Sequence, residues 1–167
     1  MELIYLKDIF ETKLEIPENY RQACIKEAYD IGDRQVKKTN VKASMSYWRI
    51  HDFTTTFDIL LQNILNTIRH NFPQIENNLG VGDAWLSIYK KDDYSQLHHH
   101  LPSLLSFTYY LKSDGTTPIN FPLENYINYP TNDTLIIFPA RFKHEVPKHK
   151  NNSERIVLAG NIEYKAK

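Results

Sequence analysis

Three consecutive histidines, His98, His99 and His100, stand directly before LPSLLSFTYYL, a run with the composition of a β-strand. Because alternate side chains of an extended strand share a face, His98 and His100 point the same way and His99 points the other way. Two imidazoles side by side on one strand face can hold one metal ion. The pattern therefore predicts two ligands of a metal site, with His99 directed away from it.

A third imidazole is available further along the chain. His144 follows a strongly apolar segment, Leu135–Phe138, within the sequence LIIFPARFKHEV. It reaches the same metal only if two strands that are distant in sequence meet in space, as they do in a double-sheet jelly roll. Three imidazoles leave coordination positions free for substrate and O₂. Because the ligands must be neutral, metal affinity should fall at acidic pH.

Arg155 opens the last strand-like segment, RIVLAGNIEY, eleven residues after His144. An arginine that points inwards near a metal needs a counter-charge, and a carboxylate held by two hydrogen bonds is its natural partner. The combination suggests a dicarboxylate that chelates the metal at one end and pairs with Arg155 at the other. On the earlier strand, Ser106, Thr108 and Tyr110 share one face. The Tyr110 phenol can donate to the same carboxylate.

The motifs HxH, SFTYYL, FPARFKHEV and ERIVLAGNI, in this order over residues 85–162, resemble the non-haem Fe(II)/2-oxoglutarate-dependent oxygenases of the prolyl-hydroxylase type. The segment KKTNVKASMSYW is similar, more weakly, to the N-terminal region of their small phage-encoded members. The resemblance implies a double-stranded β-helix core of jelly-roll form. It implies that the three metal ligands are His98, His100 and His144. It also implies that 2-oxoglutarate is bound by Arg155, Tyr110 and Tyr89.

The activity implied by the resemblance is the oxidative decarboxylation of 2-oxoglutarate by Fe(II) and O₂, coupled to hydroxylation of a second substrate with release of succinate and CO₂. A peptidyl or prolyl side chain, or a small molecule, is the expected substrate. The family's usual ligand pattern is His-x-Asp/Glu…His, whereas this chain has His100 in the place of the carboxylate, as a subset of small members does. Three neutral ligands leave the full +2 charge on the metal, which a dianionic co-substrate offsets.

Two further residues have two interpretations each. Arg141 stands where related sequences often have an apolar or aromatic residue, and it either contacts substrate or is solvated at a loop. Asn161 shares the strand face of Arg155, and it either lines the substrate pocket or is a satisfied core amide. His51, His70 and His149 have no partner pattern and are expected to be solvated. Trp48 and Trp85 are expected to be packing residues.

Two other functions remain open on the same residues. One is a cupin-type three-histidine metal dioxygenase or isomerase that does not use 2-oxoglutarate. The other is a non-enzymatic metal-binding jelly-roll module. The position of Arg155 distinguishes these two functions from a 2-oxoglutarate-dependent enzyme, because only the latter needs this arginine inside the barrel near the metal.

The elements that must position these residues are two helices followed by short strands. A helix is expected from Glu18, after Pro17, to a stop at Gly32. The apolar stripe from Phe57 to Ile68 predicts a second helix, with N-cap hydroxyls offered by 54–56. Strands are expected within residues 2–16 and at Ala84–Lys90, Leu104–Lys112, Pro118–Phe121, Thr134–Pro139 and Arg155–Tyr164. Residues 33–50 are expected to form a loop with one short strand.

This order of elements indicates an α+β, mainly β fold in a single oxygenase domain, 1–167. Residues 1–80 supply helices and strands that buttress a jelly-roll core formed by 81–167. Twenty basic and twenty acidic side chains cancel, so no nucleic-acid partner is expected. Cys24 is the single cysteine, no apolar run has transmembrane length, and no signal peptide is apparent, so we expect a soluble, cytoplasmic protein. Its oligomeric state, monomer or homodimer, stays open.

Overall fold

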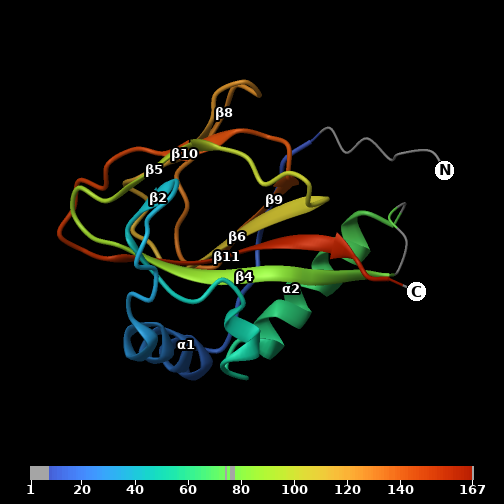
Figure 1. Cartoon of the computed structure of the whole chain (residues 1–167), viewed down its shortest axis with the longest axis horizontal. Helices are drawn as coiled ribbons and strands as arrows, with labels where there is room; N and C mark the ends of the chain where they lie inside the picture. Colours follow the sequence, from blue (N-terminus) through green and yellow to red (C-terminus); the bar gives the residue numbers. More distant parts are fainter. Residues whose placement is uncertain (1–7, 74, 76–77, 167) are drawn as a thin grey trace.

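Two antiparallel β-sheets face each other in the computed structural model, which describes residues 8–73, 75 and 78–166 (Figure 1). The larger sheet has the strand order β1-β9-β6-β11-β4-β3, and the smaller one has the order β2-β5-β10-β7-β8. The strands of the larger sheet are β1 (Phe10–Lys13), β3 (Ser44–Met45), β4 (Leu79–Tyr89), β6 (Leu105–Lys112), β9 (Thr134–Pro139) and β11 (Arg155–Tyr164). Those of the smaller sheet are β2 (Val41–Lys42), β5 (Tyr94–His98), β7 (Ile119–Phe121), β8 (Tyr126–Asn128) and β10 (His144–Val146). This arrangement is a jelly roll, as predicted.

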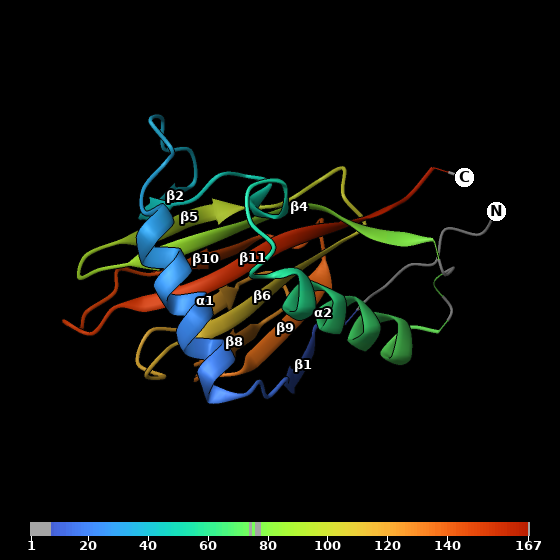
Figure 2. The ribbon, with the colours of Figure 1, turned by 90° about the horizontal axis from the view of Figure 1, so that it is seen from below.

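Two helices cover the outer face of the larger sheet, as Figures 1 and 2 show from two directions. They are α1 (Glu18–Ile31) and α2 (Asp58–Asn71), and a short 3₁₀ turn, Ile50–Asp52, precedes the second. The apolar stripe of α2 is buried against the sheet, which confirms the helix and its buttressing role. Gly32 ends α1 with a positive φ of 62°, a conformation that glycine adopts without a Cβ clash.

The predicted N-cap of α2 is wrong. The helix begins after Phe57, and no side chain caps it. The Thr54 hydroxyl instead accepts a hydrogen bond from the backbone N–H of Thr56 within the preceding turn, at 3.1 Å. Burial of the apolar face, with Phe57 and Ile64 fully buried, is therefore what stabilises this helix.

Side-chain alternation along the large sheet separates two cores. On β4, Leu86 and Ile88 belong to the core beneath the helices, whereas Trp85 and Tyr89 belong to the core between the sheets. On β11 the same alternation directs Leu158 to the helices and leaves the other face for the space between the sheets. The interior face of this sheet is therefore where the polar residues of a site can converge.

Most predicted elements are present with shifted ends. The strands at Thr134–Pro139 and Arg155–Tyr164 match their predictions, and β4 begins earlier, at Leu79. The segment 33–50 holds two short strands rather than one, and the three-residue strands β8 and β10 were not predicted, although β7, equally short, was. Of the strand expected within residues 2–16, β1 is observed, and residues 1–7 lie outside the described part. No helix in the described ranges is long and apolar enough to cross a membrane.

Candidate metal centre and anion pocket

The three predicted histidines converge between the sheets. Antiparallel pairing of β5 with β10 places His98 directly opposite His144, and one ligand atom from each of His98, His100 and His144 lies within 4.8 Å of the others. The Nε2 atoms of His100 and His144 are 3.3 Å apart. Two nitrogens that bind one ion at about 2.1 Å are separated by about 3.0–3.4 Å at ordinary coordination angles. The spacing thus suits a shared metal ion.

Backbone hydrogen bonds fix the orientation of two of the rings. The Nδ1 of His98 is 2.6 Å from the carbonyl oxygen of Gln96, and the Nδ1 of His144 is 3.1 Å from that of Phe142. A carbonyl can only accept, so each Nδ1 carries the proton and each Nε2 keeps its lone pair. Carbonyl partners of this kind are the usual support of metal-binding histidines.

Burial keeps the three imidazoles neutral. Loss of solvent lowers the pKa of His98, and it lowers the pKa of His144 well below the ordinary value, with the neighbouring histidines adding to the effect. For His100, burial first and then the neighbouring His98 lower the pKa to about 3. Neutral imidazole is the form that binds metal, so these three side chains are in the protonation state that a metal site requires. His99 is exposed and is not part of the cluster, as predicted.

His100 differs from its prediction in one detail. Strand β5 ends at His98, so His100 lies just beyond the strand and not on it. Its backbone N–H donates to the carbonyl of Ala140 at 2.7 Å, which holds it over the turn before β10. The two histidines share one side because this turn is anchored, and strand alternation is only part of the reason.

Arg155 lies inside the sandwich with 2% of its surface exposed. Its Nη1 donates to the Thr117 carbonyl at 2.9 Å, and its Nη2 donates to the Tyr110 hydroxyl at 3.0 Å. Its Nε is buried and has no hydrogen-bond partner. Within the described residues, no carboxylate pairs with this guanidinium. Burying a positive charge without a counter-charge costs several kcal/mol of desolvation free energy, so a bound anion would stabilise this site.

Two tyrosine rings flank the guanidinium. Its central carbon is 4.7 Å from the ring centroid of Tyr110 and 5.6 Å from that of Tyr89, the residue opposite Arg155 in the β4–β11 register. Burial raises the pKa of Tyr89 to about 12, so this phenol keeps its proton. Because the Tyr110 oxygen accepts from Arg155, its own proton is left to donate. The anion pocket therefore combines a cation with phenolic donors.

One cavity, of about 40 Å³, joins the two ends. Its walls include the three histidines, Arg155, Tyr89 and Tyr110, together with apolar side chains such as Ile119, Phe138 and Val157. The histidines come from the smaller sheet and its turns, whereas Arg155 and both tyrosines come from the larger sheet. The cavity is thus a short, largely apolar channel between the sheets, with three imidazoles at one end and a guanidinium at the other.

The residues present fit both groups that the sequence suggests. Three neutral imidazoles with the cavity on their open side suit a divalent transition metal with free coordination positions. An uncompensated arginine in the same cavity suits an anion, and a metal that keeps its +2 charge favours a second negative group on the same molecule. A small dicarboxylate with a chelating end satisfies both ends of the cavity.

Sequence reasoning missed the support of Arg155 and was wrong about His149. That histidine is buried, with 1% exposed, and is not solvated. Its Nε2 is 2.6 Å from the Ser153 carbonyl and its Nδ1 is 2.7 Å from the Thr117 hydroxyl. It therefore fixes the segment whose carbonyl binds Arg155. Flanked by two lysines in a polar run, His149 carries no local signal of burial.

The remaining predicted residues lie in different places. Asn161 is buried on the interior face, where its Oδ1 accepts from Ser106 at 2.8 Å, and it lines a second cavity that adjoins the metal triad. Arg141 lies in the turn between β9 and β10, with its guanidinium 4.9 Å from the Phe142 ring centroid. It is not among the residues that line either cavity.

No protein-family model matches the sequence, and no curated protein sequence matches it significantly. Solved structures do match. The viral collagen prolyl hydroxylase of Paramecium bursaria chlorella virus 1, in complex with 2-oxoglutarate, has a TM-score of 0.73 at 16% identity, covering 93% of this chain and 96% of that one. A Pseudomonas putida prolyl-4-hydroxylase has a TM-score of 0.67 at 16% identity, covering 95% and 93%.

A third similar structure is a prolyl hydroxylase of Trichoplax adhaerens in complex with a peptide fragment of the hypoxia-inducible factor oxygen degradation domain. Its TM-score is 0.70 at 12% identity, and the alignment covers 93% of this chain and 83% of that one. At these identities the similarity establishes the fold. The chain thus has the jelly-roll architecture of these oxygenases along nearly its whole described length.

Proposed function

We propose that this protein is an Fe(II)- and 2-oxoglutarate-dependent dioxygenase that hydroxylates a second substrate. The observation that carries the proposal is Arg155, a buried cation without a carboxylate partner in the described structure, in the same cavity as three convergent histidines. The fold of the similar structures, one of which holds 2-oxoglutarate, supports it.

Each end of the cavity has a defined task in this proposal. The Nε2 atoms of His98 and His144, with His100, hold the metal. Arg155 binds the far carboxylate of 2-oxoglutarate, with phenolic donors from Tyr110 and Tyr89 beside it. Bound iron with 2-oxoglutarate supplies the activation of O₂ that oxidises a C–H bond of the second substrate, with release of succinate and CO₂. The apolar walls exclude water and keep the electrostatic interactions strong.

For the second substrate, only a chemical class is proposed. The similar structures include prolyl hydroxylases, one of them bound to a peptide, and these support a peptidyl or prolyl side chain; a small-molecule substrate is the alternative. The balanced charge of the chain gives no reason to propose a nucleic-acid substrate.

Two other functions fit the triad less well. A three-histidine dioxygenase or isomerase of the cupin type, and a metal-binding module without activity, both use a histidine cluster. Neither requires an inward arginine without a counter-ion at the far end of the metal cavity. The cost of burying that charge therefore favours the 2-oxoglutarate enzyme.

The test is anaerobic addition of Fe(II) and 2-oxoglutarate, followed by exposure to air. We expect a weak visible metal-to-ligand charge-transfer band and then succinate formation. Arg155→Ala should lose the band while it still binds metal. The matched control is Arg69→Ala, because the Arg69 guanidinium also donates to a carbonyl, that of Leu79 at 3.2 Å, and also has an unpartnered Nε. Absence of both band and succinate in the wild type would refute the proposal.

A further inference from the structure

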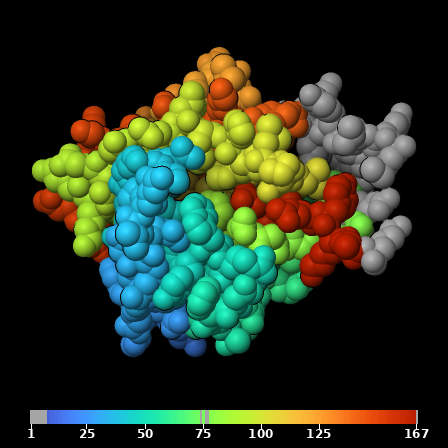
Figure 3. All heavy atoms as spheres, viewed as in Figure 1, coloured from blue at the N-terminus to red at the C-terminus, as the bar shows by residue number. Residues whose placement is uncertain are grey.

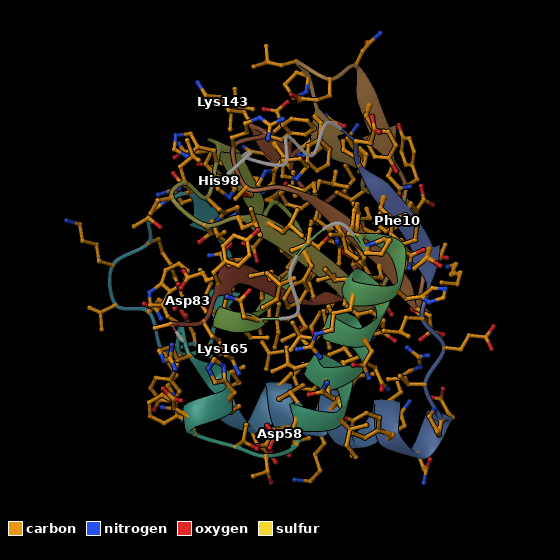
Figure 4. All side chains as sticks on the ribbon, turned by 90° about the vertical axis from the view of Figure 1, so that its right-hand side faces the viewer. Phe10, Asp58, Asp83, His98, Lys143 and Lys165 are labelled. Atoms are coloured by element: carbon orange, nitrogen blue, oxygen red, sulfur yellow. The ribbon has the colours of Figure 1, made fainter. Side chains whose placement is uncertain are left out.

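A second cavity, of about 90 Å³, opens on the outer side of the histidines. Its lining includes His98 and His100 together with Trp48, Trp85 and Asp83. In Figure 3 a hollow lies between the light-blue segment around residues 39–48 and the yellow segment around residues 98–103. Figure 4 shows His98 and Asp83 on the same side of the molecule. This cavity is therefore a second chamber beside the metal site.

Both tryptophans of the chain form part of this wall. Their rings meet edge to face, with centroids 5.1 Å apart, and the Trp85 ring lies 5.7 Å from that of His100. Trp48 is 42% exposed, yet its carbonyl accepts a hydrogen bond from Ala84 N–H at 2.9 Å, which holds it against β4. The Trp48 ring is thus exposed but anchored and offers a π face to a ligand, whereas Trp85, only 4% exposed, forms the buried floor of the cavity.

Asp83 adds a negative charge to the same wall. Its carboxylate is half-buried, and it forms no hydrogen bond or ion pair with any residue that the structure describes. Arg49 lies nearby, but its guanidinium is bound to Asp52 at 2.7 Å and to the Gly82 carbonyl at 2.6 Å. The pKa of Arg49 is raised first by Asp52, and Asp83 contributes only a weaker, longer-range attraction. The carboxylate thus remains able to bind another cation.

Asn161 supplies a donor to the cavity. Since its Oδ1 accepts the Ser106 hydroxyl at 2.8 Å, the amide is oriented and its N–H groups are left to donate. A carboxylate, an amide donor and the exposed indole of Trp48 form a combination suited to an organic cation that also carries a carbonyl or hydroxyl oxygen.

We infer that this cavity is a cation subsite, and that the hydroxylated substrate carries an ammonium or guanidinium group that binds between Asp83 and the two tryptophans. The identification of the ligand as the substrate rests on the proposed oxygenase function; the binding of a cation does not. The chemistry is shared by a free amine and by a lysyl or arginyl side chain of a peptide.

The test uses tryptophan fluorescence of the full metal-free chain, because both indoles border the cavity and no tryptophan lies elsewhere. The probes are Nα-acetyl-lysine amide, Nα-acetyl-arginine amide, cadaverine as a free amine, and Nα-acetyl-norleucine amide as a neutral analogue of the lysine probe. We expect saturable binding of the cationic probes, with at least about tenfold weaker binding of norleucine. Tighter binding of the lysine amide than of cadaverine, which carries two ammonium groups, would identify a peptide side chain as the source of the amine.

Asp83→Asn, which changes charge with little change in shape, should weaken the cationic probes about tenfold and leave norleucine unaffected. Asp58→Asn is the matched control, because Asp58 is exposed on α2 at the helical end of the molecule (Figure 4) and its loss should change nothing. Equal binding of lysine and norleucine by the wild type, or unchanged lysine binding by Asp83→Asn, would overturn the inference. The assay needs neither iron nor 2-oxoglutarate, so its failure is distinguishable from failure of the oxygenase proposal.

Discussion

Replacement of Arg155 by methionine separates ligand binding from stability. The guanidinium makes hydrogen bonds to the Thr117 carbonyl and the Tyr110 hydroxyl, 2.9 and 3.0 Å long, but has no carboxylate partner among the described residues. Losing them costs about 1.5–3 kcal/mol each. Removing an uncompensated buried charge recovers several kcal/mol of desolvation. The two effects offset each other, so ligand-free Arg155→Met should lose no more than about 1 kcal/mol of unfolding free energy.

The same change should greatly weaken 2-oxoglutarate binding. Truncating one partner of a buried charge pair costs about 2–5 kcal/mol, and about 2.7 kcal/mol corresponds to a hundredfold rise in the dissociation constant. A wild-type protein with ligand at about a hundred times its dissociation constant gains about 2.7 kcal/mol, whereas the variant at the same concentration gains about 0.4 kcal/mol. For a chain of this size, these gains correspond to shifts in Tm of about 5–10 °C and about 1 °C.

Thermal unfolding with Ni(II), with and without 2-oxoglutarate, measures both quantities without turnover. Arg69→Met controls for the loss of a guanidinium that donates to a carbonyl outside the cavity. The reasoning fails if ligand-free Arg155→Met is destabilised by several kcal/mol and still shows the full ligand shift. In that case the arginine would be a structural residue and the anion would bind elsewhere.

Three further outcomes are expected. His100→Asp should still bind Ni(II) in calorimetry, because a carboxylate oxygen is also a ligand for such metals; complete loss would show that His100 is not a ligand. Hydrogen bonds, first from Thr116, lower the pKa of Asp114 in the folded protein. The ionised carboxylate therefore contributes its full stabilisation of the fold above the unfolded pKa of about 3.8, and this stabilisation is lost as pH falls below that value. Asp114→Asn should therefore reduce the fall of Tm at acidic pH. Asp133→Ala should cost about 3–5 kcal/mol in urea unfolding, because it removes the partly buried partner of Arg21, 2.5 Å away, and leaves this buried guanidinium only the exposed Glu18 as a counter-charge.

Controls for the last two changes are present in the chain. Asp30→Ala breaks the exposed Lys26–Asp30 pair on α1 and should leave urea unfolding nearly unchanged, unlike Asp133→Ala. Asp58→Asn, on the surface of α2, should leave the acid limb of the wild type intact. A steep acid limb in Asp114→Asn, equal to that of the wild type, would contradict the assignment of that slope to Asp114.

The sequence predicted the larger elements because their periodicity is long. The stripe of α2 identifies both the helix and its buried face, and the ten residues of β11 are enough to identify a strand, whose first eight residues are buried on both faces. It missed β8 and β10, because their three residues contain little pattern; β8 is the second strand of a local hairpin with β7, whereas β10 pairs with β5, far away in the sequence. The N-cap prediction failed because the local hydroxyls of 54–56 are used within their own turn.

The candidate site was predicted where a residue type is unusual, and missed where a common residue is used. Histidines at alternate positions and an arginine at the start of a strand stand out in a sequence. The carbonyl of Thr117 and the burial of His149 do not, since both depend on loops brought together by the sandwich. Trp48 and Trp85, expected as packing residues, line a cavity because the segment before α2 folds back on β4.

The division of the site between the sheets has a mechanical consequence. His98, with the turn that holds His100, and His144 belong to the smaller sheet, and Arg155 with its tyrosines belongs to the larger one. A molecule that bound both ends of the cavity would cross-link the two sheets. It would add polar contacts to an interface that is formed mainly by apolar side chains. Ligand binding would then limit the motion of one sheet relative to the other. Amide hydrogen exchange in β5 and β10 would be slower in the ligand-bound protein than in the ligand-free protein, in both strands together.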